Sequence, residues 1–116
     1  MKRVQSYSFG QITIDEKTYT NDLIITPAEL YTDWWRKEGH KLQLEDLEQI
    51  IEPFPDILVI GTGTNGRMKI SSDVMNWLKN EVQIKIITEK STKAVKKYNK
   101  LIEEKKSVGL AIHLTC

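Results

Sequence analysis

Ile57-Leu58-Val59-Ile60, with the loop Gly61-Thr62-Gly63-Thr64-Asn65-Gly66 directly after it, decides how the sequence folds. The four apolar residues show no polar alternation, a pattern typical of a strand covered on both faces within a parallel sheet. Parallel strands are joined by long crossovers that usually contain a helix. The stretch therefore predicts an α/β domain whose helices and further strands follow residue 66.

Two helices and two strands are expected after this loop. Ser71 or Ser72 is the predicted cap of the first helix and Ser91 that of the second, because a serine hydroxyl can accept from the amides of a helix N-terminus. Apolar residues at helical or strand spacing mark the successive elements, namely Val74, Met75 and Leu78, then Ile84, Ile86 and Ile87, then Ala94, Tyr98, Leu101 and Ile102, then Val108, Leu110, Ile112 and Leu114. The predicted order is βαβαβ with right-handed crossovers.

The region before residue 57 adds a small β layer and one helix. Short runs with strand-type residues are Ile12–Ile14, Thr18–Thr20 and Leu23–Ile25, the last stopped by Pro27. Residues 28–41 lack periodicity and predict a long ordered loop, which in compact domains is often functional. Leu44, Leu47, Ile50 and Ile51 then recur at helical spacing. The fold class is α/β, with a mixed central sheet, a βαβαβ C-terminal half and a small N-terminal β layer.

Composition indicates one ordinary globular domain over residues 1–116. The sequence is 40% hydrophobic and 28% charged, and it contains no apolar run of the roughly 20 residues that cross a bilayer. No apolar stretch follows Met1–Tyr7, so we expect no secretory signal and no membrane partner. The single cysteine, Cys116, cannot form an intramolecular disulfide. These features predict a cytoplasmic protein.

Charge is unevenly distributed although the net charge is only +1. Between Asp15 and Asp56 the sequence has eleven acidic and four basic residues. Between Lys85 and Lys106 it has eight basic and three acidic residues. Such a dipolar surface favours self-association, with the basic helix meeting the acidic half of a second copy. The lysines at 93, 96, 97 and 100 share one helical face. With net charge near zero, we interpret that face as solvated and do not expect nucleic-acid binding.

The glycine loop is the first candidate site. Residues Gly61, Thr62, Gly63, Thr64, Asn65 and Gly66 match G-x-G-x-x-G after a buried strand, where backbone amides can hold a phosphate. The predicted helix starts too late for a dinucleotide fold, in which it begins within the loop. Two readings stay open, a tight turn with positive φ and a site for a smaller anionic ligand at the carboxyl ends of parallel strands.

The aromatic segment Trp34-Trp35-Arg36-Lys37-Glu38-Gly39-His40 is the second candidate. Trp35 and Arg36 could line a pocket or anchor a partner, because tryptophan and arginine are favoured at binding hot spots, and His40 could transfer a proton. The alternative is that one indole fills the core while the charges face water. His113, on the last strand, is interpreted as a packed or hydrogen-bonded core imidazole. No catalytic triad, metal site or cofactor is predicted from these residues.

Nearly the whole chain resembles a known family of small domains. The residues that carry the resemblance are Tyr7-Ser8-Phe9-Gly10, Trp34 to His40, Leu58-Val59-Ile60-Gly61-Thr62-Gly63, Tyr98-Asn99 and Ala111-Ile112-His113-Leu114. The family includes mitochondrial complex I assembly factor 3 and the adipogenesis-associated domain protein. The resemblance implies a three-layer β/β/α domain, places the family's Gly-Thr-Gly at Gly61, Thr62 and Gly63, and suggests an assembly role.

Two functions are therefore expected. The leading hypothesis is a non-catalytic binding or assembly module that self-associates or holds another protein, with a groove between the glycine loop and the Trp34–His40 segment. The alternative is an enzyme or sensor for a small anionic ligand, in which Arg36 grips the anion and His40 transfers protons.

Overall fold

The structure is a computed structural model and describes residues 3–36, 40–47 and 54–116. Residues 37–39 of the aromatic segment, and Ile50 and Ile51 of the predicted helix, lie outside these ranges. The elements follow the chain in this order: β1 Val4–Ser8, β2 Gln11–Ile14, β3 Lys17–Tyr19, β4 Leu23–Ile25, β5 Leu30–Tyr31, β6 Lys41–Leu42, a 3₁₀ turn η1 Leu44–Asp46, β7 Ile57–Thr62, β8 Lys69–Ile70, α1 Ser72–Asn76, a π-type turn η2 Trp77–Val82, β9 Lys85–Glu89, α2 Ser91–Glu103 and β10 Val108–His113.

The central sheet has five strands in the order β5-β4-β10-β7-β9. Strands β10, β7 and β9 run parallel, whereas β4 is antiparallel to β10 and β5 is antiparallel to β4. The sheet is therefore mixed, as predicted, and the βαβαβ unit forms its parallel part. Strand β10 lies in the middle, and all six of its residues are buried.

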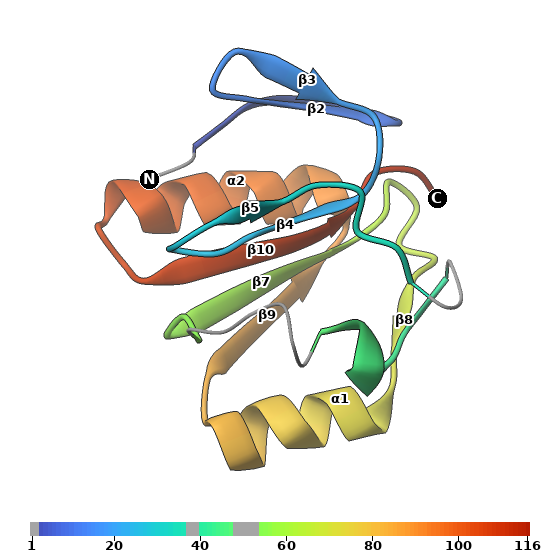
Figure 1. Ribbon diagram of the computed structural model, residues 1–116, viewed down its shortest axis with the longest axis vertical. Coiled ribbons are helices and arrows are strands. Elements are labelled where there is room, and N and C mark those ends of the chain that lie inside the picture. Colours follow the sequence, from blue (N-terminus) through green and yellow to red (C-terminus); the bar gives the residue numbers. More distant parts are fainter. Residues whose placement is uncertain (1–2, 37–39, 48–53) are drawn as a thin grey trace.

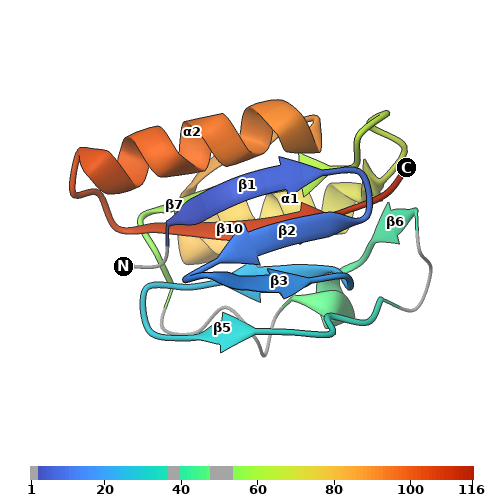
Figure 2. The same ribbon diagram turned by 90° about the horizontal axis from the view of Figure 1, so that it is seen from above.

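The two helices cover opposite faces of this sheet, as Figure 1 shows. Strand β9 lies on one side of β7 and β10 on the other, so successive right-handed crossovers place α1 and α2 on opposite faces. Helix α2 shares its face with the antiparallel sheet β1-β2-β3, and the two lie side by side in Figure 2. The α/β class and the layered arrangement are confirmed.

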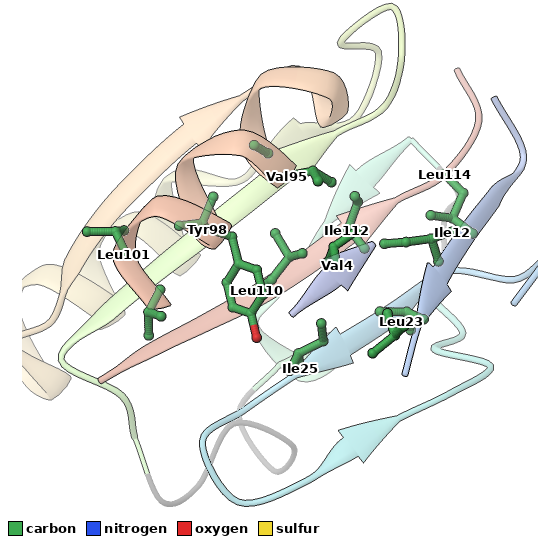
Figure 3. Packing of buried hydrophobic residues seen from close by; sticks show 14 residues of the cluster. Val4, Ile12, Leu23, Ile25, Val95, Tyr98, Leu101, Leu110, Ile112 and Leu114 are labelled. Atoms are coloured by element: carbon green, nitrogen blue, oxygen red, sulfur yellow. The ribbon is translucent and has the colours of Figure 1, made fainter. Parts of the chain in front are cut away.

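Each face buries its own apolar cluster. On the α2 face, Tyr98, Leu110 and Ile112 pack with Val4 and Ile12 of the small sheet (Figure 3). On the α1 face, the core includes Ile60, Ala111 and Leu78, together with Trp34 from the aromatic segment. Burial of a large apolar side chain contributes about 1.5–3 kcal/mol, so both clusters hold the layers together. No described helix is long and apolar enough to span a membrane.

Three local expectations differ from the structure. The region from Leu44 begins with a short 3₁₀ turn instead of a regular α-helix. The predicted loop 28–41 contains strand β5 and enters β6, which pairs in parallel with β8. Ser71 caps α1 as expected, but Lys90 and not Ser91 occupies the cap position of α2. The Ser91 hydroxyl bonds to groups outside its own helix.

Strand register brings distant residues to one rim of the central sheet. His113 pairs with Thr62, so β10 and β7 end together. Strand β4 runs the other way and pairs Leu23 with Ile112, which places Asp22 at the same rim. The glycine loop leaves β7 here, next to the last residues of the chain (Figure 1).

Candidate functional site

A buried polar cluster lies at this rim and joins three segments of the chain. The Asp22 carboxylate accepts from Arg36 Nη2 at 2.6 Å through Oδ2, and from the backbone amide of Leu114 at 2.7 Å through Oδ1. His113 Nδ1 lies 2.7 Å from the same Oδ2. The side chains of Arg36 and His113 are only 3% and 7% exposed. Asp22 therefore ties the start of β4 to the aromatic segment and to the end of β10.

Donor and acceptor chemistry fixes the hydrogen on His113. A carboxylate only accepts, so Nδ1 carries the hydrogen that reaches Asp22. A guanidinium also only donates. Arg36 Nη2 and His113 Nδ1, which lie 3.0 Å apart, are therefore two donors that share one acceptor, Asp22 Oδ2. The opposite ring atom, Nε2, then lies 3.5 Å from the Thr115 hydroxyl.

The pKa of Asp22 reflects these contacts. Burial by itself would raise it, but the hydrogen bonds from His113, the Leu114 amide and Arg36, with the charge of Arg36, outweigh burial. The pKa of Asp22 therefore lies below its ordinary value of 3.8. The carboxylate stays ionised as the counter-ion of Arg36.

Trp34 and Arg36 are both built into the core of the molecule. The Arg36 guanidinium carbon lies 4.6 Å from the centre of the Trp34 ring, within the range of a cation–π contact. The buried Trp34 indole donates to the carbonyl of Asp46 at 3.0 Å. His40 is exposed, and its ring meets His113 edge to face at 5.6 Å. One indole thus fills the core, as the alternative interpretation of the sequence expected, but that interpretation also placed the charges in water, and Arg36 is buried.

The glycine loop uses its amides within the chain. The amides of Thr64, Asn65 and Arg67 donate to the carbonyls of Thr115 and Cys116, and those of Gly66 and Met68 donate to carbonyls in the loop itself. The amide of Gly63 donates to the Ser91 hydroxyl at 2.8 Å. An anion would have to displace these bonds to be held by the loop, so this geometry matches the tight-turn reading.

Ser91 holds the glycine loop close to the end of β10 through hydrogen bonds to Gly63 and His113. Its hydroxyl donates to the carbonyl of His113 at 2.6 Å while it accepts from Gly63, and its own amide donates to the Gly63 carbonyl. Gly63 has φ +103°, and a Cβ there would lie 2.7 Å from the Cys116 carbonyl oxygen and 2.9 Å from His113 Cδ2. Only glycine fits this backbone and this space.

A groove opens beside the buried cluster, and no residue of the glycine loop lines it. Its volume is about 520 Å³, and we call it the Trp35 groove. It is lined by Thr20, Asn21, Asp22, Asp33, Trp34, Trp35 and Thr115. Trp35 is 78% exposed, in contrast to its neighbours Trp34 and Arg36, which are each 6% exposed. The walls are joined where Asn21 donates to Asp33 at 2.7 Å and the Trp34 amide donates to the carbonyl of Asp22.

A second depression of about 240 Å³ continues from this groove. It shares Thr20, Asn21 and Asp33 with the Trp35 groove and is lined otherwise by Lys17, Thr18, Tyr19 and Thr32. It therefore follows strand β3, which lies at the edge of its sheet.

The structure brings some of the predicted site residues together and separates others. Arg36 and His40 both meet His113, and Trp35 forms the wall of the groove, but none of the residues 61–66 lines that groove. Within the described part of the chain, no three His, Cys, Asp or Glu side chains gather in a way that could hold a metal ion. Ligand binding by the predicted residues stays a prediction.

Asp22, Ser91 and Thr115 are the rim residues that sequence reasoning missed. In the sequence, Asp22 lies between two predicted short strands, and Ser91 was predicted to be a helix cap. An antiparallel pairing of Leu23–Ile25 with the last strand would have placed Asp22 beside His113, and this pairing is the one signal that could have found it.

Comparison with solved structures shows the same fold in other organisms. A protein from Xanthomonas campestris is 21% identical, with a TM-score of 0.81 over 98% of this chain and 85% of that chain. A conserved hypothetical protein from Pyrococcus horikoshii is 26% identical, with a TM-score of 0.78 over 98% of this chain and 99% of that chain. A Bordetella pertussis protein described as a Mth938-like domain is 16% identical, with a TM-score of 0.68 over 97% and 85%.

A protein family described as "Protein of unknown function (DUF498/DUF598)" matches residues 4–113. This match and the Mth938-like neighbour confirm the resemblance to a family of small uncharacterised domains. Because the match covers nearly the whole chain, the protein belongs to the DUF498/DUF598 family of proteins of unknown function.

Proposed function

We propose that this protein is a non-catalytic binding module that holds a partner protein in the Trp35 groove. The observation that carries the proposal is the exposure of Trp35, 78%, between two residues that are each only 6% exposed. The Trp34 and Arg36 side chains on either side of Trp35 are buried and hydrogen-bonded inside the molecule, while the indole of Trp35 faces outward. Exposed tryptophans beside a polar groove are typical of binding hot spots, which bury a large rigid surface at small entropic cost.

The polar groups at the rim support binding over catalysis. Arg36 and His113 are buried and both are engaged by the half-buried Asp22, so a substrate would have to break an ion pair to bind Arg36. The loop amides from Gly63 to Met68 already donate within the chain. Both arrangements speak against the alternative, in which a small anion is held by Arg36 and the glycine loop.

Affinity capture with matched variants tests the proposal. Phe9 provides the control, because it and Trp35 are the exposed large hydrophobic residues of the described chain, at 59% and 78%. We expect wild-type protein and Phe9→Ala to capture the same partner from native lysate, and Trp35→Ala to lose it. Equal capture by all three proteins would refute the proposal.

Self-association is a second candidate, favoured by the charge distribution. The side chains of Lys93, Lys96, Lys97 and Lys100 are all exposed on α2, opposite in charge to the acidic first half. Light scattering at low and high salt tests it, since a contact between exposed charges weakens as salt screens it. A monomer at low salt and high protein concentration would exclude this candidate.

A further inference from the structure

We infer that the Trp35 groove takes an extended basic segment, with an arginine or lysine side chain lying on the Trp35 indole and its charge facing Asp33. This inference rests on the proposed function and names the chemistry of the partner.

The charge of the groove comes from Asp33. Its lining contains two carboxylates, Asp22 and Asp33, and no lysine or arginine is among the described residues that form it. Asp22 is already neutralised by Arg36, and both of its oxygens accept bonds from inside the molecule. Asp33 is exposed and is held by the neutral amide of Asn21. No cation among the described residues forms a salt bridge with Asp33, and Lys17 lines only the neighbouring depression along β3, so the Trp35 groove itself is complementary to one positive charge.

The indole of Trp35 adds a second feature that suits a cation. An arginine or lysine over the face of a tryptophan is attracted by the quadrupole of the neutral ring, whose face is negative, and tryptophan is the best aromatic partner for this contact. The chain itself contains such a pair one residue away, where Arg36 lies over Trp34. A planar guanidinium can stack on the ring and direct its N–H groups at a carboxylate at the same time.

The shape of the site favours an extended segment. The Trp35 groove continues into the depression along β3, and the two share Thr20, Asn21 and Asp33. Strand β3 pairs with β2 on one side and is the edge of its sheet on the other. An edge strand presents backbone donors and acceptors that an extended peptide can pair with. A peptide lying along β3 therefore delivers its side chain to Asp33 and Trp35.

The test uses two capped peptides that differ only in charge. The probe is acetyl-Thr-Val-Arg-Val-Thr-amide, and its control replaces arginine with citrulline, which has nearly the same shape but no charge. Each is titrated into labelled protein and followed by amide and indole NMR signals. We expect the Trp35 indole and the amides of residues 17–21 to shift with the arginine peptide, and the citrulline peptide to bind about threefold to tenfold more weakly.

Variants identify the residues that interact with the charge of the peptide. Asp33→Asn should reduce the difference between the two peptides to the part that the Trp35 indole contributes, while Asp56→Asn, an exposed aspartate at the opposite end of β7, should preserve it. Equal binding of both peptides, or no arginine-dependent shift at the Trp35 indole, would overturn the inference.

Partner capture separates this inference from the proposed function. If Trp35→Ala loses the partner but Asp33→Asn keeps it with unchanged affinity, the binding module stands and the basic segment is wrong. If Trp35→Ala keeps the partner, the proposed function itself is wrong.

Discussion

The glycine loop and the Trp35 groove both meet Thr115, yet they offer very different surfaces to a partner. The loop has the residue types of a ligand site, but its amides from Gly63 to Met68 donate to groups within the chain. The groove has no recognisable motif, but it presents a largely exposed indole and an exposed carboxylate beside a hollow of about 520 Å³.

This difference shows that residues matching a ligand-binding motif can have a structural role. The glycines allow the chain to turn at the rim and to receive the carbonyls of Thr115 and Cys116. The Asp22 cluster acts in the same way, because its charges neutralise one another inside the fold. Our proposal therefore places recognition in the segment that follows β5, where Trp34 and Arg36 are buried while Trp35 is exposed.

The largest effect is expected at Gly63. Gly63→Ala places a methyl group against Cys116 and His113 at φ +103°, so we expect a loss of about 3 kcal/mol or more in the free energy of unfolding. Gly10→Ala is the control, because Gly10 also has positive φ, +81°, but a methyl group there would have nothing within 4 Å. That variant should lose only about 1 kcal/mol. Urea unfolding measures both, and equal losses would mean that the loop is not packed against the last residues.

A somewhat smaller effect is expected at Asp22. Asp22→Asn removes the counter-ion of the buried Arg36, and we expect a loss of about 2 kcal/mol. Glu103→Gln is the matched control, because Glu103 pairs with Arg3 at 3.1 Å on the surface, where both side chains are about 60% exposed. Its expected loss is at most about 1 kcal/mol. If both variants unfold at the same urea concentration, the cluster does not stabilise the rim.

The same carboxylate predicts a pH dependence. Because the pKa of Asp22 is lowered in the folded state, its stabilisation is complete above the ordinary value of 3.8 and is lost as pH falls from there through the lower folded-state pKa. Wild-type stability should therefore fall more steeply in this acidic range than that of Asp22→Asn. Parallel stability curves for the two proteins between neutral and acidic pH would contradict the prediction.

The smallest effect on stability is expected at Trp35. Since its side chain is 78% exposed, Trp35→Ala should change the free energy of unfolding by less than about 0.5 kcal/mol. Phe9→Ala should behave alike. A loss above about 1 kcal/mol at Trp35 alone would show that the indole packs on the fold and is not presented to a partner.

Local patterns were enough to predict most of the fold. Unbroken or alternating β-branched runs located β4, β7 and β10, because strands of this kind must bury apolar side chains on one or both faces. The helical spacing from Ala94 to Ile102 likewise located α2. In the region from Leu44, apolar residues at the same spacing predicted a regular helix, but the structure has a 3₁₀ turn at Leu44–Asp46.

The candidate site could be predicted only in part, because it depends on contacts between distant residues. Asp22 and His113 are 91 positions apart and meet through the pairing of β4 with β10. The Ser91 hydroxyl serves Gly63 and His113 instead of its own helix. Within an aperiodic segment, no spacing distinguishes the buried Trp34 from the exposed Trp35.

The most direct test of partner binding compares the groove with the loop in one measurement. The dissociation constant of the captured partner is measured for Trp35→Ala and for Asn65→Ala, which changes an exposed loop side chain but keeps the loop amides. We expect Trp35→Ala to weaken binding about tenfold or more while Asn65→Ala leaves it unchanged. The reverse result, with binding lost in the loop variant and retained in the groove variant, would contradict recognition by the groove.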